Sequence, residues 1–516
     1  MTSYYIGYDC GTMGTKVAIY AEDSTLVAEA YRAHKIDYPK PGWAEMEPDQ
    51  FLRCVTDGIK ECMTTSGIDP RQVRGISCSG IICGFVPIDD TWTPTRPYLC
   101  FLDTRAKQEA AEVAAMDDKP WYDEAGNAEP GAYMPPMFMK WLLTHEPDNM
   151  SRATSVVHAG HYVMGKLGAL TGADAFTDWA HASGWIIGFD ARKREWSDRQ
   201  FEALKIPREL IPPMRKPWDV VGELSPAGAE ACGLVAGIPL VAGAGDIMQS
   251  NLGSGVIDVG MCSDVAGTAS IFTFVADDFK REVTDKNVIL NSMATLEDQY
   301  MYWSFIPAGG LSLRWFRDEV LMRQGDDDAF RQLDELAANV PMGSEMSLFF
   351  PYLQGRSNPA WGEASASFIG MYGSNNAGTM WRSLLESIAF EYLAFINVLR
   401  SVGVELKEVI GTGGGSKSRI WNQMKADVLA APYTTLTRTE GAVLGNAVLA
   451  AYGVGDISDI RGTIQDWLER KDSVQPNPAN TAVYQQIAER REAILNGPLR
   501  EVMRELTALQ DLEVPS

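Results

Sequence analysis

Apolar runs separated by tight, glycine-containing turns open the chain. The first run covers residues 4–9 and is rich in β-forming residues, and similar runs follow at 16–20 and 25–31. The turn between the first two runs reads Cys-Gly-Thr-Met-Gly. Short strands joined by such turns predict antiparallel hairpins. In a Rossmann unit a helix would begin directly after the glycines, so the pattern excludes that unit here.

Helical and strand patterns alternate further along the chain. Helix is predicted over 49–65 and over most of 140–172, and buried strands are predicted over 73–79 and 239–244. The charged, periodic stretch 481–509 predicts helices on either side of its Gly-Pro pair, packed on the second half of the chain. This alternation is typical of an α/β fold.

The opening pattern recurs about halfway along the chain. Asp264-Val-Ala-Gly-Thr-Ala lies between apolar runs and resembles Asp9-Cys-Gly-Thr near the N-terminus. Two related turns predict two similar α/β halves that face each other. We place the domains at 1–250 and 251–516, with the boundary near 246–260 and a C-terminal helix in the second domain.

Composition narrows the class of protein. The chain has 516 residues and a net charge of −23, which argues against a nucleic-acid partner because phosphate-binding surfaces concentrate Lys and Arg. Eight cysteines without a CxxC pair are expected to be reduced. The sequence shows no signal-peptide pattern and no apolar stretch of membrane-spanning length. We therefore expect a cytoplasmic protein without a membrane partner.

Three glycine-rich turns are candidates for binding phosphate. They are the opening turn with Gly11, Thr12, Thr15 and Lys16, the turn with Gly267 and Thr268, and the turn with Gly414 and Gly415. Glycine lets backbone amides converge, and threonine hydroxyls and a lysine add donors and charge. Any one such turn is more often only a tight turn. The GxxxxGK[ST] pattern of P-loop enzymes is absent from the sequence.

Two acids at strand ends form a second group of candidates. Asp9 ends the first strand, and Asp246 follows the strand at 239–244. Such an aspartate can accept a proton from an attacking hydroxyl, or can hold Mg²⁺. It can equally be a turn residue, and Asp246 can cap a helix. His158 and His161 resemble a metal pair, but with no carboxylate or cysteine cluster beside them in sequence we expect helix packing.

Taken together, these stretches resemble the FGGY carbohydrate kinases, a branch of the actin-like ATPase superfamily, over nearly the whole chain. The matches, in the family's order, are the opening D-x-G-T-x-x-x-K turn, Ala182-Ser183-Gly184, Gly243-Ala244-Gly245-Asp246, Ala308-Gly309-Gly310, the 350–355 stretch, Gly413–Ser418 with Trp421, and Glu440-Gly441-Ala442. Seven matches in one order are far more specific than any single motif.

The resemblance implies a fold and a set of roles. The fold is α/β, with two actin-like (ribonuclease H-like) ATPase domains facing a central cleft, and the cofactors are ATP and Mg²⁺. Asp246 would be the general base and Asp9 would lie by Mg²⁺. The nucleotide and its phosphates would be bordered by Gly11, Thr12, Thr15, Lys16, Gly267, Thr268, Gly310, Gly414 and Gly415. A homodimer is left open.

The residues expected to face the substrate resemble those of xylulose kinases but differ from them at several positions. Their S-G-Q-M-H-G loop reads Ser-Gly-Ile-Ile-Cys-Gly here, which places Ile82 and Cys83 where Met and His stand. The N-Q-R-E stretch of glycerol kinases is absent. Trp43, in a G-W-x-E-x-x-P stretch, and Asp103, in a D-x-R segment, also resemble sugar-side residues. Arg356 begins a stretch that replaces the usual E-R-x-P, and Met137 replaces a usual Lys.

Several functions stay open on this basis. A small ketose, foremost a ketopentose such as xylulose, is the leading acceptor. Ribulose, a deoxyketose, gluconate, erythritol or a quorum-signal polyol is the alternative. An actin-like ATP-driven binding protein would share the phosphate turns but needs no sugar residues such as Trp43 and Asp103. A silent sugar sensor would be expected to lose Asp246 or Thr12, and both are present.

Overall fold

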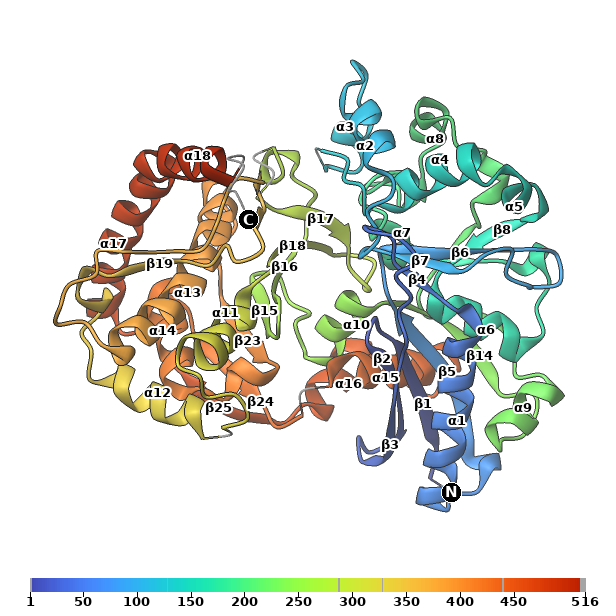
Figure 1. The fold of residues 1–516 in the computed structure, drawn as a ribbon. Coiled ribbons are helices and arrows are strands. Elements are labelled where there is room, and N and C mark those ends of the chain that lie inside the picture. Colours follow the sequence, from blue (N-terminus) through green and yellow to red (C-terminus); the bar gives the residue numbers. More distant parts are fainter. Residues whose placement is uncertain (1, 128, 286–287, 327, 439, 511–516) are drawn as a thin grey trace.

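The computed structural model describes residues 2–127, 129–285, 288–326, 328–438 and 440–510. Two lobes, each built on a mixed β-sheet with helices around it, lie side by side (Figure 1). Within the described residues, no helix is both long enough and apolar enough to cross a membrane.

The sheet of the first lobe begins with the predicted hairpins. Its order is β13 (Val220–Glu223), β14 (Pro239–Gly245), β5 (Val73–Gly80), β1 (Tyr4–Cys10), β2 (Gly14–Ala21) and β3 (Leu26–Ala33). Strands β1, β2 and β3 are antiparallel neighbours, whereas β1, β5 and β14 run parallel. The first three strands therefore confirm the hairpin prediction.

The sheet of the second lobe repeats this arrangement. Its order is β17 (Leu290–Met293), β18 (Tyr300–Ile306), β16 (Ser270–Ala276), β15 (Met261–Ala266), β23 (Glu408–Thr412), β24 (Tyr433–Leu436) and β25 (Arg470–Val474). Strands β18, β16 and β15 are antiparallel, and β15, β23 and β24 are parallel. The prediction of two similar halves is confirmed, while the boundary between 250 and 251 stays a prediction.

Two helices connect the lobes where the sheets approach each other. α10 (Asp246–Gly253) follows β14, and α15 (Gly441–Gly453) follows β24 of the second sheet but packs on α10 and on β1 and β5 of the first sheet. Gly253 and Gly441 allow this close crossing, because a Cβ on Gly253 would overlap the carbonyl oxygen of Gly441. The late segment of the chain thus returns to the first lobe.

A small sheet lies above the first lobe's main sheet in Figure 1. Its order is β4 (Glu45–Met46), β7 (Tyr98–Cys100), β6 (Gly84–Ile88) and β8 (Ser155–Val157). Strand β8 interrupts the stretch 140–172, which was predicted to be mostly helical. Its valines pair with β6, so a tertiary partner overrides the local helical pattern between α4–α5 (Pro135–His145, Pro147–Arg152) and α6 (Ala159–Gly168).

Helix ends follow the expected capping chemistry. The helix predicted at 49–65 is α1 (Pro48–Ser66), where the Glu47 carboxylate accepts a hydrogen bond from the backbone N–H of Asp49 and Gly67 ends the helix in the left-handed region.

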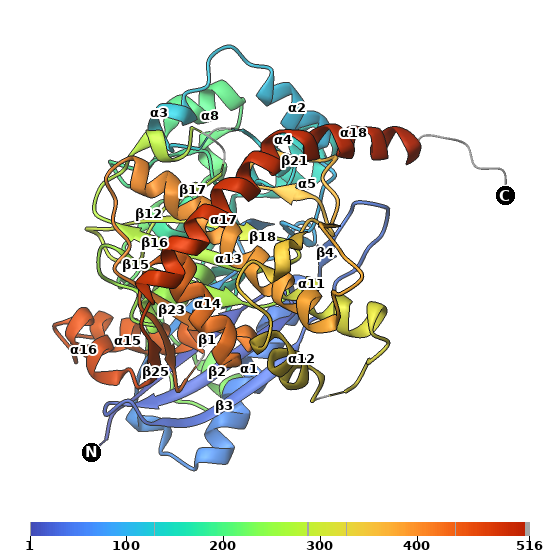
Figure 2. The same cartoon turned by 90° about the vertical axis from the view of Figure 1, so that its left-hand side faces the viewer.

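The predicted C-terminal helices are α17 (Pro478–Asn496) and α18 (Pro498–Gln510), on the outer side of the second lobe in both views (Figures 1 and 2). α17 packs on α14 (Arg419–Leu429), which confirms its predicted place.

Candidate functional site

Parallel strand ends bring the two candidate acids to one edge of the first sheet. Cys10 of β1 is in register with Gly80 of β5, and Gly80 is in register with Gly245 of β14. Asp9 and Asp246 adjoin these positions, so they lie at the carboxyl ends of two parallel strands, β1 and β14, with β5 between them, at the sheet edge where open α/β sheets bind their ligands. The Asp9 carboxylate accepts a hydrogen bond of 2.7 Å from the Ser79 hydroxyl.

Asp246 is the first residue of α10, and the preceding Gly245 occupies the N-cap position. Its Oδ1 accepts a hydrogen bond of 2.8 Å from the backbone N–H of Ile247. Burial, and secondarily the like charge of Asp9, raises the pKa of Asp246 to about 8. A carboxylate with such a pKa is suited to take a proton near neutral pH.

Strand alternation separates the other residues of the opening turn. Lys16 is directly opposite Asp9 in the β1–β2 hairpin, and Thr15 is opposite Cys10. Lys16 therefore shares a face with Asp9, and its ammonium pairs with the Glu440 carboxylate from the segment before α15. Thr15 is buried on the opposite face, so the structure does not bring it to the acids.

His34 supports the opening turn, and sequence reasoning missed it. Its Nδ1 lies 2.9 Å from the carbonyl oxygen of Gly11, and its Nε2 lies 2.8 Å from the Thr15 hydroxyl. Burial lowers the pKa of His34, which favours the neutral ring that donates through Nδ1 and accepts through Nε2. A lone histidine after the third strand carries no local signal of this contact.

A buried hydrogen-bond chain reaches Asp9 from the helices that link the lobes. Asn446 of α15 donates to the Ser79 hydroxyl oxygen at 2.9 Å, and Ser79 donates to Asp9. The Asn446 oxygen accepts from Gln249 of α10 at 2.8 Å, and the Gln249 oxygen accepts from the Thr295 hydroxyl at 3.1 Å. The chain fixes Asp9 relative to both linking helices.

Replacing Asn446 by Leu is expected to destabilise the protein by on the order of 2 kcal/mol, because buried partners are left unsatisfied. One of these is the backbone carbonyl of Tyr8, which accepts from Asn446 at 2.8 Å. Urea unfolding measures the change. Asn339→Leu, at the exposed end of α12 (Ala329–Ala338), serves as the matched control, and equal stability of the two variants would contradict the role of the chain.

The glycine turns of the second lobe converge in the same way. The backbone N–H of Gly310, in α11 (Gly309–Trp315), donates to the carbonyl of Gly267 at 3.0 Å, and Leu311 donates to that of Thr268 at 2.9 Å. A Cβ at position 310 would overlap the Gly267 carbonyl. Arg314, missed from the sequence, donates to the Thr268 hydroxyl at 2.5 Å and adds a cation to this turn.

The turn with Gly414 and Gly415 follows β23, which is parallel to β15. A side chain at Gly415 would overlap Ala266, the residue before Gly267, so the two turns are adjacent. Nothing lies within 4 Å of a Cβ built on Gly414. The predicted nucleotide residues Gly267, Thr268, Gly310, Gly414 and Gly415 are thus brought together.

The two related turns are not equivalent, however. Asp264, the counterpart of Asp9, is fully buried and pairs with Lys425. Its carboxylate also accepts hydrogen bonds from the hydroxyls of Tyr433 at 2.7 Å and Tyr392 at 2.6 Å. These contacts make Asp264 a structural anchor of the second lobe, and only Asp9 is near the proposed base.

The strand register of the small sheet places the candidate sugar-binding residues close together. β7 is antiparallel to both β6 and β4, so the residues after β7 lie beside those before β6 and β4. Asp103, Cys83 and Trp43 therefore share one edge. Asp103 is fully buried; its Oδ2 accepts from the backbone N–H of Ala44 at 2.7 Å and pairs with Arg105 at 2.8 Å.

Arg105, the arginine of the D-x-R segment, links the predicted pair Asp103 and Trp43. Its guanidinium lies 3.7 Å from the centre of the Trp43 ring and also pairs with Glu45 at 2.7 Å. With its carboxylate occupied by Arg105 and a backbone amide, Asp103 orders the Trp43 segment in this structure.

Ile82 and Cys83 present an apolar surface beside Asp246. A Cβ on Gly245 would overlap the Ile82 side chain, which places Ile82 against the strand end that carries the acid. The Cys83 thiol donates to the carbonyl of Gly184 at 2.9 Å, and both side chains are about 95% buried.

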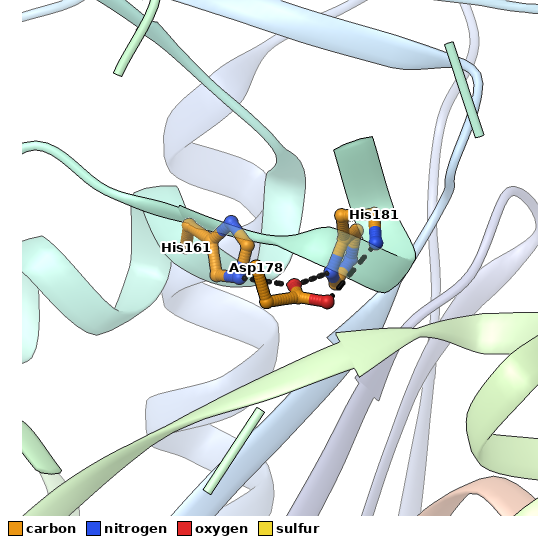
Figure 3. Close-up of side chains that lie close together, drawn as sticks. All are labelled: His161, Asp178 and His181. Carbon is orange, nitrogen blue, oxygen red and sulfur yellow. Dashed lines mark hydrogen bonds and ion pairs between the residues drawn. The ribbon is translucent and has the colours of Figure 1, made fainter. Parts of the chain in front are cut away.

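The histidine pair at 158 and 161 belongs to a larger buried cluster, in which His158 lies beside His161 and His181. Figure 3 shows His161, His181 and Asp178 of this cluster. The expectation that no carboxylate accompanies it is wrong, because Asp178 lies 3.3 Å from His161 Nε2 and 2.5 Å from His181 Nδ1. Asp178 is distant in sequence, so spacing gave no signal. Its Oδ1 also caps α7 (Trp179–Ser183) by accepting from two backbone amides, and we interpret the cluster as a hydrogen-bond network that holds α7.

Because of this cluster, we expect the folding stability of the protein to fall at acidic pH. Burial lowers the pKa of His161 from 6.5 to about 4. Because the folded state then binds fewer protons than the unfolded chain between these values, stability falls as the pH drops through that window. Burial alone would raise the pKa of Asp178, but the neighbouring imidazoles hold it below its usual range. Its stabilising contribution is therefore lost only below the histidine window.

When the pH falls from 6.5 to 5, the free energy of unfolding of wild type is expected to drop by on the order of 2 kcal/mol more than that of His161→Gln. Urea unfolding at both pH values measures the difference. His145→Gln, on a half-exposed histidine of α4, is the control and should keep the wild-type slope. An unchanged slope in His161→Gln would contradict the account.

Comparison with known proteins assigns the chain to a family. The models of the N- and C-terminal domains of the FGGY family of carbohydrate kinases match residues 4–253 and 263–454. A xylulose kinase of Staphylococcus epidermidis is 28% identical, covering 95% of this chain and 96% of that protein. An autoinducer-2 kinase of Salmonella paratyphi B is 25% identical, covering 95% and 94%.

A solved structure agrees with these matches. The crystal structure of a xylulose kinase from Rhodospirillum rubrum has a TM-score of 0.87 at 27% identity and covers 97% of this chain and 100% of that one. These findings confirm the fold class and the family resemblance expected from the sequence. The chain belongs to the FGGY family of carbohydrate kinases, ATP-dependent phosphotransferases with the actin-like ATPase fold.

Proposed function

We propose that this kinase phosphorylates a hydroxyl of a small ketose, foremost a ketopentose such as xylulose, with Asp246 as the general base. The observation that carries the proposal is the shared strand edge, where Asp246 and Asp9 end two parallel strands on either side of β5 and Lys16 shares the face of Asp9. The sugar-side residues Trp43 and Asp103 on the small sheet, and relatives named xylulose kinases, support the ketose.

The mechanism follows from these positions. Asp246 accepts the proton of the acceptor hydroxyl as its oxygen bonds to the γ-phosphorus of ATP, and the bond from that phosphorus to the β,γ-bridging oxygen breaks to release ADP. Lys16 leaves Glu440 and stabilises the phosphoryl oxygens, together with backbone amides of the turn at Gly11 and Thr12. The turns at 267–268 and 414–415, with Gly310 beside Gly267, border the nucleotide, and Arg314 adds charge beside Thr268.

Asp9 is the residue that fits Mg²⁺. Its carboxylate is partly buried and keeps oxygen lone pairs beyond the one that Ser79 occupies, and Mg²⁺ prefers such oxygen ligands, often through water. When bound, the ion would neutralise charge on the phosphates. Asp9 would orient that ion, while the Asn446–Ser79 chain holds the carboxylate in place.

The raised pKa of Asp246 predicts the pH dependence of the reaction. A general base must be deprotonated, so kcat/KM for the acceptor should rise with pH through the pKa of the free enzyme, about 8. Below that value log kcat/KM should fall linearly with decreasing pH. Steady-state kinetics from pH 5.5 to 9.5 test this, and a profile that stays flat down to pH 5.5 would argue against Asp246 as the base.

The apolar surface of Ile82 and Cys83 favours a second acceptor class. Sites that bind sugar hydroxyls discriminate through buried polar groups, and Ile82 places none beside Asp246. A deoxyketose or a quorum-signal polyol would tolerate this surface better than a fully hydroxylated sugar. The similarity to a protein named autoinducer-2 kinase supports this candidate.

ADP release from Mg·ATP across a panel of acceptors tests the proposal. The panel contains xylulose, ribulose, a 1-deoxyketose, gluconate, erythritol and a quorum-signal polyol. One acceptor with a high kcat/KM supports the kinase proposal and identifies its substrate class. ADP release that ignores every acceptor would instead favour an ATP-driven binding protein. A cytoplasmic location and a homodimer remain proposals, and light scattering of the purified chain tests the second.

A further inference from the structure

A cavity in the second lobe lies apart from the kinase site. It has a volume of about 600 Å³ and lies between α13 (Ala377–Ser401) and α17. In Figure 1 α17 lies on the outer side of the second lobe and α13 lies inside it, and both are away from α10, β1 and β5. Its lining includes Arg356, Arg400 and Arg491, the exposed Glu489 and Glu492, and Phe390.

Two arginines that line this cavity, Arg356 and Arg491, share one buried glutamate, Glu391. Arg491 Nη2 lies 2.6 Å from one oxygen of Glu391, and Arg356 Nη2 lies 3.4 Å from the other. The Tyr352 hydroxyl also donates to Glu391, at 2.8 Å. One carboxylate therefore serves two guanidiniums, and the buried group carries one positive charge in excess.

The hydrogen-bonding capacity of these arginines is not exhausted. The Nε atoms of Arg356 and Arg491 are buried and have no hydrogen-bond partner, although both residues are at least 90% buried. Arg400 adds a third cation. Its guanidinium donates to the Leu429 carbonyl at 2.7 Å, and no ion pair is found for it within the described residues. A buried excess charge with free donors is costly unless an anion compensates it.

The second cation at this cavity is a departure of this chain. Arg356 stands at the first position of the stretch where the family pattern reads E-R-x-P. The substitution places a positive charge where that pattern has a negative one, and the proposed phosphoryl transfer makes no use of it. A separate binding role accounts for both the charge and the cavity.

We propose that the cavity binds a small phosphate-bearing anion at Arg356 and Arg491. The planar guanidinium, with several donors in a fixed fork, matches the oxygens of a phosphate group. Glu489 and Glu492 lie on the exposed rim, and their charge disfavours extended polyanions. The ligand class is therefore a compact molecule with one phosphate group, either free phosphate or a small sugar phosphate.

Titration calorimetry on the full chain tests this site, with saturating Mg·ADP filling the nucleotide site. The probes are inorganic phosphate and ribose 5-phosphate, against sodium chloride of equal ionic strength. Arg356→Met keeps the Glu391–Arg491 pair and is expected to weaken phosphate binding by at least ~10-fold, as loss of a charge-assisted contact implies. Arg331→Met, on an exposed arginine of α12, removes the same charge and should bind as wild type does.

The two probes distinguish the sources of phosphate. Tighter binding of ribose 5-phosphate than of inorganic phosphate indicates a sugar phosphate, and equal binding indicates the free ion. Absence of phosphate binding by wild type beyond the chloride control would overturn the proposal, as would wild-type affinity in Arg356→Met. If that variant fails to fold, Arg356→Lys, which keeps the charge without the fork, replaces it under the same criteria.

Kinase kinetics provide an independent control. Arg356→Met lies outside the kinase site, so kcat measured without added phosphate should equal that of wild type. Failure of the phosphate-binding proposal and failure of the acceptor proposal can therefore be told apart.

Discussion

Replacing Asp246 by Asn is expected to lower kcat by at least ~10²-fold, the low end of what general-base catalysis contributes. The amide cannot take the hydroxyl proton, but its oxygen can still accept the hydrogen bond from the backbone N–H of Ile247. The start of α10 should therefore survive, and KM for the acceptor should change little. Steady-state kinetics and a thermal melt measure the two effects separately.

A matched control removes one carboxylate elsewhere. Asp57→Asn, on an exposed position of α1, should leave kcat unchanged. Turnover of Asp246→Asn within a few-fold of wild type, in a folded protein, would remove Asp246 from the mechanism and with it the argument from the strand ends.

Replacing Lys16 by Met is expected to lower kcat by ~10²- to 10³-fold, the range seen when one donor to a developing negative charge is removed. Lys16 shares the face of Asp9 and carries the cation nearest to it in the hairpin. Its present partner, Glu440, would have to release it when ATP binds. Transient kinetics with saturating acceptor separates the chemical step from nucleotide binding.

Glu440→Gln provides the contrast. If the ion pair competes with the phosphates, freeing Lys16 should leave kcat within a few-fold of wild type and should lower KM for ATP. Loss of activity in Glu440→Gln equal to that in Lys16→Met would show that the pair itself is required, and would contradict the proposed release of Lys16.

Local chemistry made much of the fold and site predictable. The hairpins of β1–β3 follow from apolar runs and glycine turns, and the parallel β5 and β14 follow from buried runs that end in Gly80 and Gly245. Once β1, β5 and β14 are adjacent parallel strands, their register places Asp9 and Asp246 at the same edge of the sheet. The repeated turn at Asp264 likewise predicted the second sheet.

What the sequence did not predict depends on partners far apart along the chain. His34 meets Gly11 across 23 residues within the first lobe, and Asn446 meets Ser79 only when α15 packs on β1 and β5. Neither residue carries a local pattern. Similarly, Asp178 joins the histidines through tertiary packing. Asp9 and Asp264 have equivalent sequence contexts, yet only the structure shows that Lys425 neutralises Asp264 in the core.

The choice of acceptor depends on a few side chains rather than on the fold. Ile82 lies against the strand end that carries Asp246, whereas Arg105 and Trp43 form a more polar edge of the small sheet. An acceptor that places its hydroxyls toward the second group and an apolar carbon toward Ile82 would satisfy both. This is why a deoxyketose belongs in the panel beside xylulose.

In the proposed reaction, phosphate passes from ATP to an acceptor hydroxyl while Asp246 takes the proton. Phosphorus-31 NMR of the reaction mixture, for wild type and Asp246→Asn with the best acceptor of the panel, distinguishes this reaction from ATP hydrolysis. A phosphomonoester resonance should grow in step with ADP for wild type and should be nearly absent for the variant. Inorganic phosphate as the sole product, formed equally by both proteins, would rule out transfer to the acceptor.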